Sequence, residues 1–175
     1  MKEISIKDIK INPFQMFGEN WAALAAGNLE NGYNAMTIAW GHLGTLWERD
    51  SHTNHLPTAI CYVRPSRYTK NFLDKESYFT ISCFSDEYKK ALGYLGSHSG
   101  SNSDKIKNSG LTPEFINNTT YFAEAQTVYI CRKLYQAPLL ESGFAEKGLV
   151  DFNYPLKDFH EMYVGEIIKV LIPKT

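Results

Sequence analysis

Arg64, Arg67 and Lys70 place three cations within seven positions of a chain whose formal net charge at pH 7 is only −1. Pro65 disfavours a helical conformation at the residue before it, and Ser66 is a favourable helix N-cap. The stretch therefore predicts a helix that begins directly after Ser66. Two of the cations would lie in its first turn, where they oppose the helix dipole at a cost of about 0.3–1 kcal/mol each at low salt. A bound anion would remove this cost.

The same stretch carries the other groups that a phosphate group requires. The free backbone N–H groups of a first helical turn, the hydroxyl of Thr69 and the amide of Asn71 would join the cations. A monoester phosphate is the ligand that this set favours. The alternative is that Arg67 and Lys70 are solvated surface charges, with nearby carboxylates such as Asp74 as their partners.

A second candidate is the strand-like stretch NAMTIAW, residues 34–40. Alternation in a strand places Ala35, Thr37 and Ala39 on one face. Such small side chains would allow a flat ligand to approach the strand backbone, whose N–H and C=O groups could bind its polar edge. The alternative is that these small residues face a packed neighbour.

The stretch GSHSGSNSDKIKNSG, residues 96–110, is rich in glycine and serine. Its hydroxyls, its backbone donors and Lys105 could contact an anion, as is typical of a binding loop in a small domain. A flexible linker is the alternative interpretation.

A third polar cluster, ERDSHTNH at residues 48–55, contains two acidic residues and two histidines. These side chains could bind a hard or borderline metal ion, which would make the protein a metal-dependent hydrolase. Because no ordered scaffold is evident around the cluster, we favour a surface loop and predict no metal site. The residues concerned are Glu48, Asp50, His52 and His55.

The composition limits the class of protein. With 43% hydrophobic and 21% charged residues, the 175 residues predict one globular domain over 1–175. Cys61, Cys83 and Cys131 lie far apart inside apolar runs, which predicts buried, reduced thiols and a cytoplasmic protein. The balanced charge and the lack of a long apolar stretch indicate neither a nucleic-acid partner nor a membrane partner.

Strand signals outnumber helix signals along the chain. Asn31-Gly32 predicts a hairpin turn between the first two strands. The pattern indicates a closed or partly open antiparallel barrel with helices packed outside it. The predicted strands cover 22–27, 35–40, 58–63, 77–84, about 125–137 and 161–172, and the predicted helices cover 67–74, 87–95 and 104–109, with caps at Ser66, Asp86 and Ser103.

Five motifs occur in a fixed order over most of the chain. Together they resemble the flavin reductase-like FMN-binding split-barrel family, and most closely its flavoredoxin-type branch. The motifs are Y-N-A-M-T-x-A-W from residue 33, V-R-P-S-R-Y-T-x-N-F from 63, F-T-I-S from 79, L-G-x-x-S-G-x-x-x-D-K-I-x-x-S-G-L from 95 and H-x-x-x-x-G-E-I from 160.

This resemblance implies a mainly β fold, a six-stranded antiparallel split β-barrel of Greek-key type with a few peripheral helices. It also implies a homodimer with FMN near the interface. The implied activity is that of an NAD(P)H-dependent flavin reductase, which passes electrons to free flavin or to a protein acceptor. The alternative within the resemblance is a flavoredoxin-like electron-transfer protein without its own turnover of nicotinamide.

The resemblance also implies roles for particular residues. The edge of the isoalloxazine ring would be lined by Asn34, Ala35, Met36, Thr37, Ala39 and Trp40. The phosphate and ribityl chain would be held by Arg67, Thr69, Lys70 and Asn71, and the flavin would be flanked by Ser82, Cys83 and Phe84. The loop at Ser99, Gly100 and Lys105 would close over the phosphate, and His160 would lie near the reducing nucleotide.

Two positions depart from the pattern of the family. Asp158, Phe159 and His160 stand where many members have Gly-Asp-His, and Ser101 stands where many relatives have a basic residue. Both departures bear more on nicotinamide binding than on FMN binding.

Overall fold

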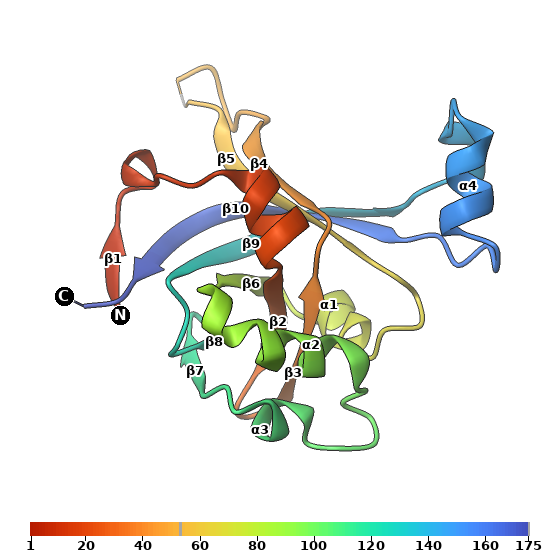
Figure 1. Cartoon of the computed structure of the whole chain (residues 1–175). Helices are drawn as coiled ribbons and strands as arrows, with labels where there is room; N and C mark the ends of the chain where they lie inside the picture. Colours follow the sequence, from red (N-terminus) through yellow and green to blue (C-terminus); the bar gives the residue numbers. More distant parts are fainter. Residues whose placement is uncertain (53, 175) are drawn as a thin grey trace.

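An antiparallel eight-stranded sheet is the frame of the protein in a computed structural model that describes residues 1–52 and 54–174 (Figure 1). Its strands run in the order β3-β2-β6-β9-β10-β5-β4, and β1 pairs with β10 beside the chain termini. The bounds are β1 (Lys2–Ile4), β2 (Ala22–Asn28), β3 (Gly32–Ile38), β4 (Gly41–Leu46), β5 (Leu56–Val63), β6 (Tyr78–Cys83), β9 (Thr127–Pro138) and β10 (Glu161–Ile172). A separate hairpin pairs β7 (Pro113–Ile116) with β8 (Thr119–Phe122).

The predicted mainly β, antiparallel fold is confirmed. The six predicted strands correspond to β2, β3, β5, β6, β9 and β10. The other two strands of the sheet, β1 and β4, are short elements at its margins. β4 lacks a strong strand signal because its sequence, GHLGTL, contains two glycines, which are depleted in strands.

Two apolar cores lie on opposite faces of the sheet, as alternation along β6 requires. Phe79, Ile81 and Cys83 point into one core, which they share with side chains of β2, β5, β9 and β10. The second core lies under α2 (Lys89–Ser97), α3 (Lys105–Ser109) and the β7–β8 hairpin. Figure 1 shows these two helices together along one side of β2 and β3.

The helices begin later than predicted. α1 (Lys70–Lys75) begins at Lys70 after the N-cap position Thr69, so the predicted cap at Ser66 is wrong. Consecutive turns precede α1 instead, since the backbone N–H of Arg67 donates to Arg64 O at 3.0 Å and that of Lys70 to Arg67 O at 2.9 Å. Arg67 therefore lies before the helix, and the dipole argument does not apply to it.

The other two predicted caps are also displaced. A 3₁₀ turn over Asp86–Tyr88 separates Asp86 from α2. Asp104, rather than Ser103, caps α3 through a 3.1 Å hydrogen bond from the backbone N–H of Lys107. Gly110 ends α3 as predicted, in a left-handed conformation with φ +80° that favours glycine.

The long strands β9 and β10 extend beyond the barrel as an arm that carries α4 (Lys147–Asn153) at its end (Figure 1). The predicted hairpin between β2 and β3 is confirmed, and the Asn28 side chain accepts hydrogen bonds from the backbone N–H groups of Glu30 and Asn31 at 2.9 and 2.8 Å. The remaining short helical segments are Ile6–Asp8, Gln15–Asn20 and Glu141–Gly143.

The three cysteines are buried and free, as predicted. No helix found within residues 1–52 and 54–174 has the length and apolar character needed to cross a membrane.

Candidate functional site

Two adjoining cavities lie where the end of β3, the turns before α1 and the start of β10 meet. Met36 and Arg67 line both of them. The cation cavity, of about 120 Å³, is lined by Met36, Ser66, Arg67, Tyr68, Thr69, Gly96, Ser97, His98, Ser99 and Lys105. The Trp40 cavity, of about 190 Å³, is lined by Met36, Thr37, Ile38, Ala39, Trp40, Tyr62, Arg64, Arg67 and His160.

Lys105 is a buried cation without a charged partner among the described residues. It is only 4% exposed, and Nζ donates to the backbone oxygens of Leu95 and His98, both at 3.1 Å. Burial, followed by the nearby Arg67 guanidinium, lowers the pKa of Lys105 to about 8. Buried cations normally have an anionic partner, so this cavity is suited to an anionic ligand.

Arg67 faces the same cavity from the opposite wall. Its Nη1 donates a long hydrogen bond of 3.4 Å to Gly96 O. Neither Arg67 nor Lys105 takes part in an ion pair with any residue in the described ranges 1–52 and 54–174. The cavity therefore offers the donors that bind a phosphate, namely two cations, the hydroxyls of serines and a threonine, and backbone groups.

A buried amide connects the walls of the cation cavity. The Nδ2 of Asn34 in β3 donates to Thr69 Oγ1 at 2.9 Å, which joins β3 to the turns before α1. Gly100 packs directly on the same amide, because a Cβ atom at this position would lie 2.3 Å from Asn34 Oδ1. Asn34, Thr69 and Gly100 therefore hold the loop of Ser99 and Lys105 against β3.

The small residues of β3 do not all face a cavity. Ala35 is buried in the core beneath α2, and Thr37 donates through Oγ1 to Leu92 O in α2 at 2.5 Å. Ala39 and Trp40 follow the end of β3 and line the Trp40 cavity. Thr37 and Ala39 of the predicted small-residue face line this cavity and Ala35 does not, so a flat ligand would contact only the C-terminal part of that face.

His160 lines the Trp40 cavity beside Trp40. Its ring centroid lies 4.7 Å from that of Trp40, and Nδ1 lies 2.9 Å from Tyr154 Oη. Burial lowers the pKa of His160 to about 4, and the positive charge of Arg64 acts in the same direction. The imidazole is therefore neutral at physiological pH.

Several predicted site residues lie outside both cavities. Lys70 forms ion pairs with Asp74 at 2.8 Å and Glu161 at 2.9 Å, and Asn71 lines a different surface cavity. Ser82 is fully buried, with no hydrogen-bond partner for its hydroxyl among the described residues. The structure does not bring these three residues together with Arg67 and Lys105.

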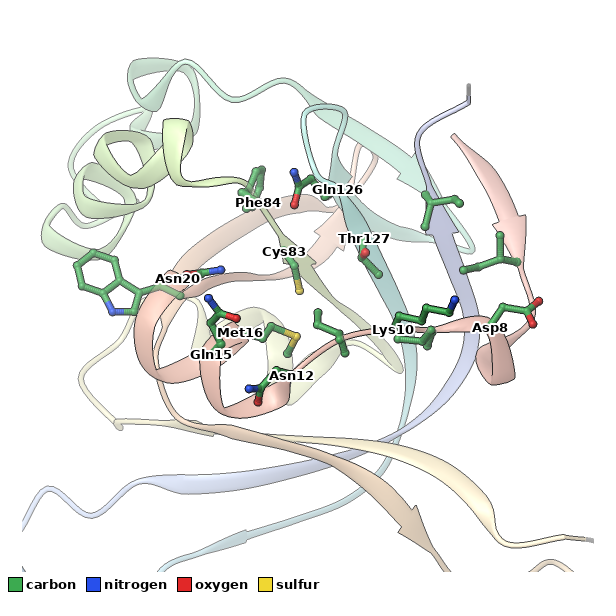
Figure 2. A pocket seen from close by; sticks show the side chains of 15 residues that line it. Asp8, Lys10, Asn12, Gln15, Met16, Asn20, Cys83, Phe84, Gln126 and Thr127 are labelled. Carbon is green, nitrogen blue, oxygen red and sulfur yellow. The ribbon is translucent and has the colours of Figure 1, made fainter.

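Cys83 and Phe84 line another cavity, of about 370 Å³, which shares no lining residue with the cation and Trp40 cavities. Figure 2 shows its wall, where the Cys83 sulfur points toward Met16 and the amides of Asn12, Gln15 and Asn20 lie along one segment. Burial raises the pKa of Cys83 to about 12, so its sulfur remains a thiol. It has no thiolate with which to act as a nucleophile.

The polar run 48–55 has contacts within itself, and its Arg49 forms an ion pair with Glu166 of β10. His55 Nδ1 lies 3.0 Å from Glu48 Oε1, and the backbone N–H of His52 donates to Asp50 Oδ1 at 2.8 Å. Thr53, within the same run, lies outside the described residues. In the part of the chain that the structure describes, no three His, Cys, Asp or Glu side chains are grouped so that they could hold a metal ion.

The sequence analysis did not assign roles to Arg64, Tyr62 and Tyr154, all of which lie at or next to the Trp40 cavity. Tyr62 was hidden within an apolar strand, and Arg64 was treated only as one member of a cation cluster. Tyr154 follows α4 and lies six positions before His160, outside every motif, so the motifs gave no reason to connect the two residues.

The fold is that of an antiparallel split barrel, and the two adjoining cavities could hold a ligand that has one anionic end and one flat end. No protein-family model matches the chain, and no curated protein matches it. Several solved structures do match its fold.

The structure is similar to the flavoredoxin of Desulfovibrio vulgaris, with a TM-score of 0.64 and 22% identity over 88% of this chain and 69% of that protein. An FMN-binding protein from Thermus thermophilus, with bound p-hydroxybenzaldehyde, has a TM-score of 0.63 and 20% identity over 87% of this chain and 71% of its own. An FMN-binding domain of a flavin reductase-like enzyme from Shewanella baltica has a TM-score of 0.64 and 13% identity over 97% of this chain and 75% of that protein. The resemblance found in the motifs is thus confirmed at the level of the fold.

Proposed function

We propose that the protein is an FMN-binding oxidoreductase, which accepts a hydride from NADH or NADPH and passes electrons to free flavin or to a protein acceptor. The observation that carries this proposal is that Arg67 and Lys105 have no ion-pair partner among the described residues and line a cavity that shares Met36 and Arg67 with the Trp40 cavity. The proteins of similar fold, which are named as FMN-binding or as flavoredoxin, support it.

The residues present fit FMN. Its phosphate would lie between Arg67 and Lys105, with the hydroxyls of Ser97 and Ser99 as further donors. The ring system would lie in the Trp40 cavity, against Ala39 and the end of β3. When bound, the isoalloxazine supplies the hydride and electron chemistry. The chain itself would bind the phosphate, orient the ring and limit access of water to the ring.

A second candidate function is an FMN-containing electron carrier that receives its electrons from a separate reductase. Trp40 lies against His160 within the cavity that a nicotinamide would need to enter, and Asp158 pairs with Arg64 at 2.7 Å instead of contacting His160. These contacts favour a site that holds flavin without admitting a second nucleotide.

One experiment tests both candidates. The protein would be titrated with FMN and followed by quenching of flavin fluorescence, and the complex would be mixed anaerobically with NADH or NADPH in a stopped-flow instrument. Bleaching near 450 nm would support the reductase. Binding without bleaching by either donor would support the carrier, and failure to bind FMN would contradict both.

We further propose that the chain acts as a single domain in a homodimer with FMN near the interface. The arm exposes Phe152 and Leu156, with 86% and 84% of their surfaces accessible, and Trp40 beside the cavity is 44% exposed. Exposed apolar groups of this kind are typical of interfaces. Sedimentation at several protein concentrations would test the dimer. The three buried thiols favour a reducing compartment such as the cytoplasm.

FMN affinity is expected to fall about 10-fold between pH 7 and pH 9.5. The pKa of Lys105 in the free protein is lowered to about 8, whereas a bound phosphate favours the charged ammonium. Binding is therefore strongest below pH 8 and weakens as Lys105 loses its proton. The phosphate monoester is already a dianion over this range, because its second pKa is about 6.

Lys105→Arg provides the control for this pH dependence, since a guanidinium keeps its charge. Its FMN affinity should be nearly independent of pH from 7 to 9.5, and so should riboflavin binding to the unmodified protein. A pH profile that is the same for FMN and riboflavin would contradict the assignment to Lys105.

A further inference from the structure

The contact between Tyr154 and His160 determines which hydrogen atom the Trp40 cavity presents to a ligand. Tyr154 is buried, and its Oη lies 2.9 Å from Nδ1 of His160. Nε2 of His160 makes no hydrogen bond with any residue in the described part of the chain, and it is not among the buried polar atoms that lack a partner. Nε2 is therefore the ring nitrogen that remains available to the cavity.

The direction of the Tyr154–His160 hydrogen bond follows from the burial of the phenol. Nδ1 of His160 is the hydrogen-bond partner of Tyr154 Oη among the described residues, and Tyr154 is buried. If Nδ1 carried the proton, the phenol hydrogen would be buried with no acceptor among these residues, whereas a buried tyrosine hydroxyl normally has a partner. The hydroxyl therefore donates to Nδ1. Nδ1 is then an acceptor, and the proton of the neutral ring lies on Nε2.

Burial first, and then the charges around His160, keep the ring neutral. Arg64 and Arg67 both disfavour a second positive charge, and Asp158, which favours it, is neutralised by its ion pair with Arg64 at 2.7 Å. The neighbouring Tyr62, on β5, is a neutral phenol that lines the same cavity. The neutral imidazole can have its proton on only one nitrogen, so the partner of Nδ1 fixes the tautomer.

Tyr154 itself is held rigidly at the end of α4. Its backbone N–H donates to Val150 O at 2.8 Å, and its ring stacks on Phe159 with centroids 4.7 Å apart. The Arg64 guanidinium covers the ring at 5.1 Å and donates to Asn153 O at 2.8 Å. Three contacts of Tyr154 therefore fix the phenol relative to the histidine, and the hydrogen bond to Asn153 O fixes Arg64 over its ring.

We infer that Tyr154 is a positioning residue that holds His160 as the Nε2–H tautomer, so that this wall of the Trp40 cavity presents one neutral hydrogen-bond donor. The group that it recognises is an uncharged acceptor, such as a carbonyl or carboxamide oxygen of the ligand. Only the identity of this ligand rests on the proposed function, because the tautomer is a property of the protein alone.

The tautomer can be measured without any flavin. Protein labelled with ¹⁵N-histidine would be studied at pH 7 by long-range ¹H–¹⁵N correlation, with the His160 signals assigned from their loss in His160→Gln. We expect the Nε2–H pattern in the unmodified protein. Tyr154→Phe, which keeps the ring and removes only the hydroxyl, should give a mixture that includes the Nδ1–H form.

Tyr62→Phe is the matched control. It removes the phenol of another tyrosine–histidine pair, in which Tyr62 Oη lies 3.4 Å from Nδ1 of His42, and it should leave the His160 tautomer unchanged. Melting curves would verify that both variants fold. A Nδ1–H pattern in the unmodified protein, or an unchanged pattern in folded Tyr154→Phe, would overturn the inference.

A second measurement reports on ligand recognition. If the protein oxidises a reduced nicotinamide, Tyr154→Phe should raise its KM about 3- to 10-fold, as expected for one weakened hydrogen bond. In the His160→Gln background, whose amide supplies its own N–H, the Tyr154 substitution should have no further effect. An equal loss in both backgrounds would contradict a role through His160. Absence of nicotinamide turnover would contradict the reductase proposal and leave the tautomer result valid.

Discussion

Arg67→Ala is expected to weaken FMN binding about 10- to 100-fold and to change riboflavin binding less than about threefold. Each charge-assisted hydrogen bond to a phosphate contributes about 1.5–3 kcal/mol, and only FMN carries the phosphate. Arg67 is suited to this role because the one hydrogen bond that its guanidinium makes among the described residues, to Gly96 O, is long at 3.4 Å. The measurement is a pair of fluorescence titrations, one with each flavin.

Lys105→Met should give a loss of the same size, since methionine fills the buried volume of the lysine stem without its charge. The two substitutions each remove one of the two cations that line the cation cavity, so both test the same site. An equal loss for FMN and riboflavin in either variant would show that the cations are structural and would contradict the phosphate assignment.

Lys70→Met is the matched control for both substitutions. It removes the same charge from the same short stretch of sequence, but Lys70 already pairs with Asp74 and Glu161. We expect lower stability and little change in the ratio of FMN to riboflavin affinity. A selective loss of FMN binding in Lys70→Met would show that Lys70 leaves its carboxylates when the ligand binds.

The contrast between Lys70 and Lys105 shows what the sequence could and could not predict at this site. Spacing placed Lys70 beside Arg67, and the alternative that it pairs with nearby acids was already visible in Asp74. Glu161 was not visible, because it comes from β10 and lies 91 positions later in the chain. The assignment of a charge to a ligand or to a salt bridge depends on such distant partners.

The fold was easier to predict than the site. Alternation and the Asn-Gly turn identified β2, β3, β5, β6, β9 and β10, because strands that bury one or both faces leave a local pattern. Helix starts were wrong at Ser66 and Ser103, since a neighbouring residue can satisfy the same backbone groups: Asp104 takes the cap of α3. The residues that line a cavity come from separate elements, and no local sequence pattern shows which elements pack together.

The glycine of the motif H-x-x-x-x-G-E-I has a physical explanation in the barrel core. Gly165 lies in β10, between β5 and β9, at a position where the register with β9 shifts. A Cβ atom there would lie 2.5 Å from Cζ of Phe79 and 2.8 Å from Cβ of Cys131. Both neighbours are buried, so neither can move into solvent.

Gly165→Ala is therefore expected to lower the free energy of unfolding by about 1–3 kcal/mol, the usual cost of overpacking a core. For a domain of this size, each kcal/mol lowers Tm by about 2–4 °C. Urea unfolding and thermal melts would measure both quantities. The expected loss is one of stability, because Gly165 lines neither the cation cavity nor the Trp40 cavity.

Gly44→Ala supplies the control, because it is also in a strand of this sheet and a Cβ atom there meets no atom within 4 Å. Its effect should be neutral or slightly stabilising, since alanine restricts the unfolded chain more than glycine does. Phe79→Leu should recover part of the stability lost in Gly165→Ala, because the two positions contact each other and their effects are then not additive. If Gly165→Ala is as stable as Gly44→Ala, the barrel can shift at β10 to accommodate the extra methyl group. The close contact with Phe79 would then not explain why this position is a glycine.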